Sequence, residues 1–171
     1  MAWLQGLSLL LTLLGVVVIF GWLLHIPELT RLVPTLRGMV FNTALCFILL
    51  GQALRLLVAA GPSRPRLAGF SASAVLLFAL LNLLQLWGGL SLGIDLTGLH
   101  RWADDGNPNP GRMSLPTTLC FLLAASSLLL LLRSQQPTGR GMLFGRLLVA
   151  AVFALGSLSL LGYVLGLEAL F

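Results

Sequence analysis

The sequence contains no lysine, and charged residues of any kind are scarce. Only 9% of its 171 residues are charged, and all ten positive charges are arginine, against five carboxylates. A soluble domain carries about 25% charged residues, so this chain cannot cover a globule with polar surface. Instead, 58% of the residues are hydrophobic, and the mean hydropathy is +1.01. The composition therefore predicts a protein that exposes apolar surface to membrane lipids.

Several functional classes lack their signatures in this sequence. The two cysteines, Cys46 and Cys120, lie inside apolar runs and fit neither a disulfide framework nor a zinc-binding spacing. Zinc-protease motifs and phosphate-binding glycine loops do not occur. The arginines fall between the apolar runs, a pattern typical of contact with anionic lipid headgroups and not of nucleic-acid binding. We expect a non-catalytic protein with no cofactor.

Five apolar stretches are long enough to cross a membrane, which takes roughly 20 residues in a helix. They cover about 3–25, 40–60, 69–94, 116–133 and 146–167. The first stretch lacks a basic leading region and a cleavage site, so it predicts a retained helix and not a signal peptide. The predicted fold class is all-α, a polytopic membrane bundle of about five transmembrane helices in one domain, 1–171.

The arginines also predict the orientation of the chain. The polar breaks at about 61–69 and 133–146 contain arginines and no carboxylate, whereas those at about 26–39 and 95–115 contain both. Arginine-rich loops remain in the cytoplasm during membrane insertion. We therefore expect a multi-pass protein of the bacterial cytoplasmic (inner) membrane, with its N-terminus in the cytoplasm and Phe171 on the periplasmic side.

An internal repeat divides the predicted domain into helical hairpins. MVFNTALCF at 39–47 aligns without gaps with MSLPTTLCF at 113–121, an offset of 74, and five of the nine residues are identical. Upstream, 21–29 aligns with 89–97 at an offset of 68, and a partial third copy covers 162–170. Repeat one then spans about 1–66, repeat two about 67–140, and the third about 141–171. Two spans per copy predict parallel hairpins related by rotation about the membrane normal.

The repeated motifs resemble a known kind of domain. GRMSLPTTLCF at 111–121, echoed by RGMVFNTALCF at 37–47, resembles the repeated hairpins of multi-helix transmembrane input domains in bacterial signalling proteins. Such domains precede PAS, histidine-kinase or diguanylate-cyclase domains, so the resemblance implies a sensor that informs a cytoplasmic output. Because the third copy stops after one helix, the sequence predicts either a five-helix protein or the front part of a longer one.

The repeat places polar and sulfur-containing residues at the outer ends of both inward-running helices: Met39, Asn42, Thr43, Cys46, Met113, Thr117 and Cys120. We expect these residues to surround a small apolar ligand or a lipid. Cysteine and methionine sulfur also suits copper(I), which gives a soft-metal or redox alternative. A further alternative is that the cysteines pack between helices as small apolar residues.

The loop at about 95–115 is the most polar stretch of the chain. We expect it to cover the outer mouth of the bundle, with Asp95, Arg101 and Arg112 lining the mouth, although its Asx, Gly and Pro residues also suit an ordinary interfacial loop. His25 and His100 lie near the same membrane face, where histidines can bind metal or haem or respond to pH. They do not occupy equivalent positions in the repeat, so no metal site is predicted.

Two residues with amide side chains lie deep within the third span. Asn82 and Gln85 are three residues apart, on one face of a helix, and we expect them to face other helices or a cavity. No aspartate, glutamate or lysine falls in the middle of a span, which disfavours a small transporter. The leading functional hypothesis is a sensory input module for a periplasmic or membrane-borne cue. The alternative is an accessory or structural subunit that contacts other membrane subunits or associates with itself.

Overall fold

The computed structural model describes residues 2–31, 38–58, 64–103, 109–133 and 140–165. All regular secondary structure in these ranges is helical. In chain order the elements are α1 (Ala2–Leu24), α2 (Pro27–Thr30), α3 (Phe41–Val58), α4 (Arg64–Gly88), α5 (Thr97–His100), the 3-10 helix η1 (Arg101–Ala103), α6 (Leu115–Arg133) and α7 (Arg140–Leu165).

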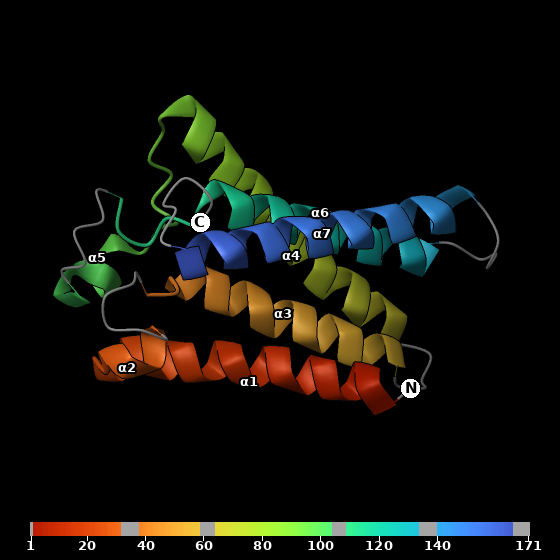
Figure 1. Ribbon diagram of the computed structural model, residues 1–171, viewed down its shortest axis with the longest axis horizontal. Coiled ribbons are helices and arrows are strands. Elements are labelled where there is room, and N and C mark those ends of the chain that lie inside the picture. Colours follow the sequence, from red (N-terminus) through yellow and green to blue (C-terminus); the bar gives the residue numbers. More distant parts are fainter. Residues whose placement is uncertain (1, 32–37, 59–63, 104–108, 134–139, 166–171) are drawn as a thin grey trace.

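Five of these helices, α1, α3, α4, α6 and α7, are long and apolar enough to cross a membrane. The predicted all-α membrane bundle is therefore confirmed. Each long helix packs on the next one along the chain, α1 on α3, α3 on α4, α4 on α6 and α6 on α7. The helix α4 is inclined to the others, and the short helices α2 and α5 lie together at one end (Figure 1). Ala2 and Leu165 lie at opposite ends, as an odd number of spans requires.

Three predicted spans agree with the observed helices to within about two residues, whereas α7 begins six residues before the predicted span 146–167 and the third span is displaced at both ends. The helix α4 begins and ends earlier than the predicted span 69–94. Pro65 fits the first turn of a helix, where no backbone N–H is needed, so the helix can begin before it. Gly89 has a left-handed backbone, with φ of +60°, directly after the last helical residue. A glycine in that conformation ends a helix.

The arginines at the end of the molecule opposite α2 and α5 lie within the long helices, as predicted for Arg55 but not for the arginines of the polar breaks. They occupy the last turns of α3 and α6 and the beginning of α4, and all are exposed: Arg55, Arg64, Arg66 and Arg133. The described carboxylates, Glu28 and Asp95, lie at the end with α2 and α5. The charge asymmetry that predicts the orientation is thus present in the fold, and the membrane side itself stays a prediction.

The order of a long helix, a short helix and a long helix occurs twice, as α1–α2–α3 and α4–α5–α6. The helices α3 and α6 begin at Phe41 and Leu115, the predicted offset of 74, so Cys46 and Cys120 occupy the same turn. The upstream alignment at 68 does not hold, because Gly21 lies inside α1 whereas Gly89 follows α4. The short helices were not predicted from the sequence.

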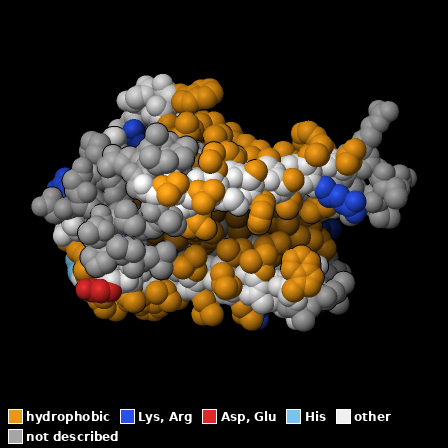
Figure 2. Space-filling view, viewed as in Figure 1, with side chains coloured by type: hydrophobic (Ala, Val, Ile, Leu, Met, Phe, Trp, Pro, Cys, Tyr) orange, Lys and Arg blue, Asp and Glu red, His pale blue; other side chains and the backbone are white. Residues whose placement is uncertain are grey.

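Two hydrophobic clusters hold the long helices together. The larger one lies between α3, α4 and α6 and contains Cys46, Leu50, Ala53, Ala72, Val75, Ala79, Met113, Phe121, Ala125 and Leu128. The smaller one joins α1 to the beginning of α3 and contains Val18, Trp22 and Ala44. Apolar side chains also cover much of the outer surface of the helices, and the charged side chains in view lie toward the two ends (Figure 2). That distribution suits a bundle surrounded by lipid.

Candidate functional site

The candidate site begins with two buried amides near the end of α4. Asn82 donates through Nδ2 to the carbonyl oxygen of Met113 at 3.1 Å and to Oγ1 of Thr118 at 2.6 Å. Thr118 in turn donates through Oγ1 to the carbonyl oxygen of Ser114 at 2.8 Å. These bonds tie α4 to the first turn of α6 through side chains that have almost no contact with solvent. The prediction that Asn82 and Gln85 face other parts of the protein is confirmed.

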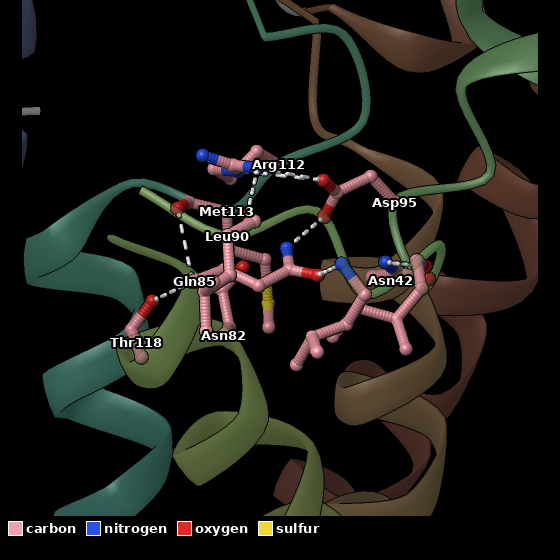
Figure 3. A network of polar contacts seen from close by, with 10 residues as sticks. Asn42, Asn82, Gln85, Leu90, Asp95, Arg112, Met113 and Thr118 are labelled. Carbon is pink, nitrogen blue, oxygen red and sulfur yellow. Dashed lines mark hydrogen bonds and ion pairs between the residues drawn. The ribbon is translucent and has the colours of Figure 1, made fainter. Parts of the chain in front are cut away.

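Gln85 holds the beginning of the outer loop. Its Nε2 donates to Oδ1 of Asp95 at 2.8 Å, and its Oε1 accepts the N–H of Leu92 at 2.9 Å. The other carboxylate oxygen of Asp95 is 3.3 Å from the guanidinium of Arg112, which also donates to the carbonyl oxygen of Leu90 at 3.0 Å. Both oxygens of this buried carboxylate are therefore engaged (Figure 3). A buried charge is stable only when it is paired in this way.

The return of the loop toward α6 depends on one glycine. Gly111 has a φ of +83°, and a side chain there would overlap the carbonyl of Asp95 and lie 2.7 Å from Nδ1 of His100. Only glycine combines this backbone conformation with so close an approach. The loop therefore folds back on itself, and Arg112 is positioned beside Asp95.

The same loop also contacts the first hairpin. Asn42, at the beginning of α3, donates through Nδ2 to the carbonyl oxygen of Ile94 at 2.7 Å. The backbone N–H of Phe41 donates to Nε2 of His100 at 3.2 Å, and Nδ1 of His100 lies 3.0 Å from the carbonyl oxygen of Leu96. Because Nε2 accepts, Nδ1 must carry the proton of a neutral imidazole.

Trp22 of α1 completes the contact between the hairpins. Its ring centroid lies 4.2 Å from that of His100 and 5.2 Å from that of Trp102. Its indole N–H donates to the carbonyl oxygen of Met39 at 2.7 Å. We call the connected polar side chains of this end the outer layer: Asn42, Asn82, Gln85, Asp95, His100, Arg112 and Thr118.

Two buried polar atoms near the outer layer have no hydrogen-bond partner. They are Oδ1 of Asn42, an acceptor, and Nε1 of Trp102, a donor. Such atoms are uncommon in folded proteins, because an unpaired buried polar group is costly. Either atom can bind a water molecule or a small hydrogen-bonding ligand, and Asn42 belongs to the ligand set predicted from the sequence.

The structure divides the predicted ligand set between the two hydrophobic clusters. Cys46 and Met113 belong to the cluster between α3, α4 and α6, whereas Met39 packs on Val18 and Trp22. Thr43 is buried in α3, and Thr117 accepts a hydrogen bond from Oγ of Ser114 at 2.9 Å. Cys46 is buried, Cys120 is half-buried, and both are free thiols. The two methionines therefore pack against different hydrophobic clusters.

The predicted charged lining is also divided. Asp95 and Arg112 are brought together as an ion pair, while Arg101 is exposed on η1. Both ring nitrogens of His100 are engaged, so neither can bind a metal while these bonds persist. His25 is exposed, with its ring against Trp102. Within the described residues, no three or more His, Cys, Asp or Glu side chains form a group that could hold a metal ion.

Sequence reasoning missed the roles of Trp22, Ser114 and Thr118. The spacing of Asn82 and Gln85 indicated burial, but their partners lie in a loop whose path depends on positive φ angles at Leu96 and Gly111. Leucine gives no signal for such a conformation, because it rarely adopts it.

Comparisons with known proteins do not assign the chain to a family. No family model matches the chain, and no curated protein or solved structure is significantly similar to it. The resemblance to transmembrane input domains therefore rests on the two repeated motifs alone.

Proposed function

We propose that the chain is a non-catalytic sensory input module of a bacterial inner-membrane signalling protein, with the outer layer on the periplasmic side. The arginines at the opposite end support this orientation, because positively charged ends of helices stay in the cytoplasm. The resemblance of the repeated motifs to input domains supports the signalling role. In this proposal, membrane lipids surround the helix bundle, and a lipid can also be the ligand that the module binds.

The observation that carries the proposal is the contact of one outer loop with both hairpins. The loop that follows α4 is bonded to its own hairpin through Gln85 and Arg112. It is bonded to the first hairpin through Asn42 and His100. A ligand or condition that displaces this loop must therefore alter the contact between the two hairpins at their outer ends.

A sensor works only if its cue favours one arrangement of the helices over another. In the observed arrangement, the outer layer connects the hairpins at the end that we assign to the periplasm, while α3 packs on α4 along the bundle. Release of the outer layer would allow the two hairpins to tilt about this packed interface. The inner ends of α3 and α6 would then change their separation, and that change is the signal available to an output domain.

The proposal is tested by measuring the separation of the inner ends. Spin labels replace the exposed side chains Arg55 and Arg133, at the ends of α3 and α6, in a chain with both native cysteines changed to alanine. Double electron–electron resonance then gives the distance distribution in lipid nanodiscs. Asn42→Ala removes a bond between the hairpins, and Ser114→Ala is the matched control, because its hydroxyl bonds only within the second hairpin.

We expect Asn42→Ala to shift or broaden the distance distribution, and Ser114→Ala to leave it unchanged. Identical distributions in the parent, Asn42→Ala and Ser114→Ala would contradict the sensory proposal. The outer layer would then be a structural cap without effect on the inner ends.

A specific observation favours a second candidate, an accessory subunit of a membrane complex. Only 6% of the most apolar window of α7 is buried, against 28–39% for the other four candidate spans. A helix so weakly covered is available to a partner subunit. This candidate predicts that the chain purifies from native membranes with another subunit at a fixed ratio, and that Phe153→Ala, on the exposed side of α7, reduces the ratio. Purification as a single species in mild detergent would contradict it.

A further inference from the structure

We propose that His100 makes the contact between the outer loop and the first hairpin sensitive to acid. The imidazole is buried between Phe41 of α3, Trp22 of α1 and Leu96 of its own loop. This inference rests on the proposed function only for its biological meaning, since it names acid on the periplasmic side as a cue. The hydrogen bonds themselves do not depend on a signalling role.

The geometry requires the neutral ring. Nε2 accepts the N–H of Phe41, which is the first residue of α3, and Nδ1 uses its proton for the carbonyl oxygen of Leu96. A second proton would have to bind at Nε2, where it would face the donor of Phe41 at 3.2 Å. Two donors that face each other cannot form a hydrogen bond, so protonation breaks this contact.

The helix end reinforces the effect. The backbone N–H groups at the beginning of a helix carry a partial positive charge, which disfavours a cation there. The imidazolium would also be buried, and its desolvation opposes the charge. The ring of Trp22 acts in the other direction, because an aromatic ring can attract a cation within about 6 Å. The imidazole and indole centroids are 4.2 Å apart with their planes tilted by 58°, so this attraction offsets part of the cost of the charge.

Among the residues that the structure describes, the charged and titratable groups around His100 come from the loop and from the end of α1. Gly111 lies beside both Asp95 and His100, so Asp95 and Arg112 are close to the imidazole. These two side chains form an ion pair, and the other carboxylate oxygen of Asp95 accepts a hydrogen bond from Gln85. Arg101 follows it in the chain and is exposed. His25 lies across the ring of Trp102, which is 5.0 Å away between ring centroids. The start of α3 supplies no charged side chain between residues 38 and 47, and Glu28 of α2 is exposed.

The direction of the pH dependence follows from proton binding. Histidine changes charge between about pH 8 and pH 5. When the loop is released, His100 reaches water and can bind a proton, whereas the closed arrangement excludes that proton. The released form therefore binds more protons, so the closed form loses stability as the pH falls through this range. One proton changes the ratio of closed to released forms by at most about tenfold per pH unit.

Amide hydrogen exchange in lipid nanodiscs tests the inference with the full chain. Protection factors are measured for peptides covering 38–47 and 90–103 at about pH 7.5 and about pH 5.5, with exchange rates corrected by an unfolded reference peptide. We expect protection to fall about tenfold at the lower pH. The chain has only two histidines, which provides a matched pair of variants. His100→Gln keeps an acceptor for Phe41 without a titratable charge, and His25→Gln removes the exposed histidine.

The inference predicts that His25→Gln retains the acid-induced loss of protection and that His100→Gln abolishes it. A loss that persists in His100→Gln, or a wild-type chain whose protection is constant, would overturn it. If His100→Gln does not fold, ring nitrogen NMR of ¹⁵N-histidine-labelled His25→Gln observes His100 alone. Protonation of that ring without loss of protection would equally overturn the inference.

A negative result in this test can be distinguished from a negative result in the test of the proposed function. Acid can release the loop without moving the inner ends, in which case the acid-sensitive contact stands and the sensory proposal is contradicted. Conversely, Asn42→Ala can move the inner ends while acid leaves the loop closed, which rejects acid as the cue and leaves the sensory proposal standing.

Discussion

At the scale of single residues, the molecule is unusual in how it uses its few polar side chains. The described part of the chain buries an ion pair, three amides and an imidazole near one end of an otherwise apolar bundle. Each of these groups is bonded to a backbone or side-chain partner in the loop between α4 and α6 or beside it. The stability of that loop should therefore depend on particular atoms and not on hydrophobic burial.

Arg112→Leu should lower the stability of the folded protein markedly. It leaves the carboxylate of Asp95 buried without its counter-ion, which typically costs about 3 kcal/mol or more. Arg101→Leu is the matched control, because Arg101 is exposed and should change stability by less than about 0.5 kcal/mol. Thermal unfolding in detergent measures both. Equal melting temperatures for the two variants would contradict the assigned ion pair.

Two neighbouring threonines provide a second test at this scale. Thr118→Val keeps the shape of the side chain but leaves Nδ2 of Asn82 with one acceptor fewer, so we expect a loss of about 1–2 kcal/mol. Thr117 is half-buried and accepts only from the hydroxyl of Ser114, so Thr117→Val should cost less. Chemical unfolding in mixed micelles gives both values. A larger loss for Thr117→Val would show that the bond between Asn82 and Thr118 is not formed.

At the scale of helices, the apolar runs in the sequence predict α1, α3 and α6 well and α7 apart from its beginning, because length and hydropathy alone decide which segments can cross a membrane. They predict α4 poorly. Its true beginning includes Arg64, Pro65 and Arg66, which look like a loop but suit the first turn of a helix. Its true end depends on Gly89 and on Gln85, which accepts the N–H of Leu92 after the helix has stopped. Such a long-range contact leaves no trace in hydropathy.

The helices α1 and α3 approach each other closely. A methyl group on Gly51 would overlap Oγ1 of Thr12 and the carbonyl oxygen of Ser8. Small residues allow membrane helices to pack closely in this way. Gly156 of α7, by contrast, has nothing within 4 Å of the position of a Cβ.

Gly51→Ala should therefore destabilise the first hairpin by about 1–3 kcal/mol, because the two helices must separate. The same substitution at Gly156 should be neutral or stabilise by up to about 1 kcal/mol through helix propensity. Unfolding of both variants in parallel measures the difference. If Gly156→Ala were the more harmful change, α7 would have a neighbour on that face, as the accessory-subunit candidate requires.

At the scale of the whole molecule, the fold and the charge asymmetry could be predicted from the sequence, whereas the candidate site could be predicted only in part. Asp95, Arg112 and Asn42 were expected at the same end of the bundle, and the structure places them together at the end with α2 and α5. Met39 and Met113 were expected to share one site, but they pack in different clusters, because the second hairpin adds a longer, folded loop between its helices. Repeat symmetry in the sequence does not determine such a difference.

The orientation in the membrane is a prediction for the whole molecule. In a chain with Cys46→Ala and Cys120→Ala, Gly98→Cys should react with a membrane-impermeant thiol reagent in intact cells, since Gly98 is exposed on α5. Arg66→Cys, at the opposite end, should react only after the cells are permeabilised. The two alanine changes should not impair insertion, because both cysteines lie in strongly apolar helices. The reverse labelling pattern would contradict the orientation.

The central claim is that the loop between α4 and α6 is a folded layer that connects the two hairpins. Residue-resolved hydrogen exchange of the wild-type chain in nanodiscs at neutral pH tests it most directly. The amides of Phe41, Leu92 and Leu99 should be protected from exchange and should exchange together. Phe41 donates to His100, Leu92 donates to Gln85, and Leu99 of α5 donates to the carbonyl oxygen of Leu96. Exchange of Leu92 and Leu99 at the rate of an unfolded peptide, while the long helices stay protected, would contradict the claim.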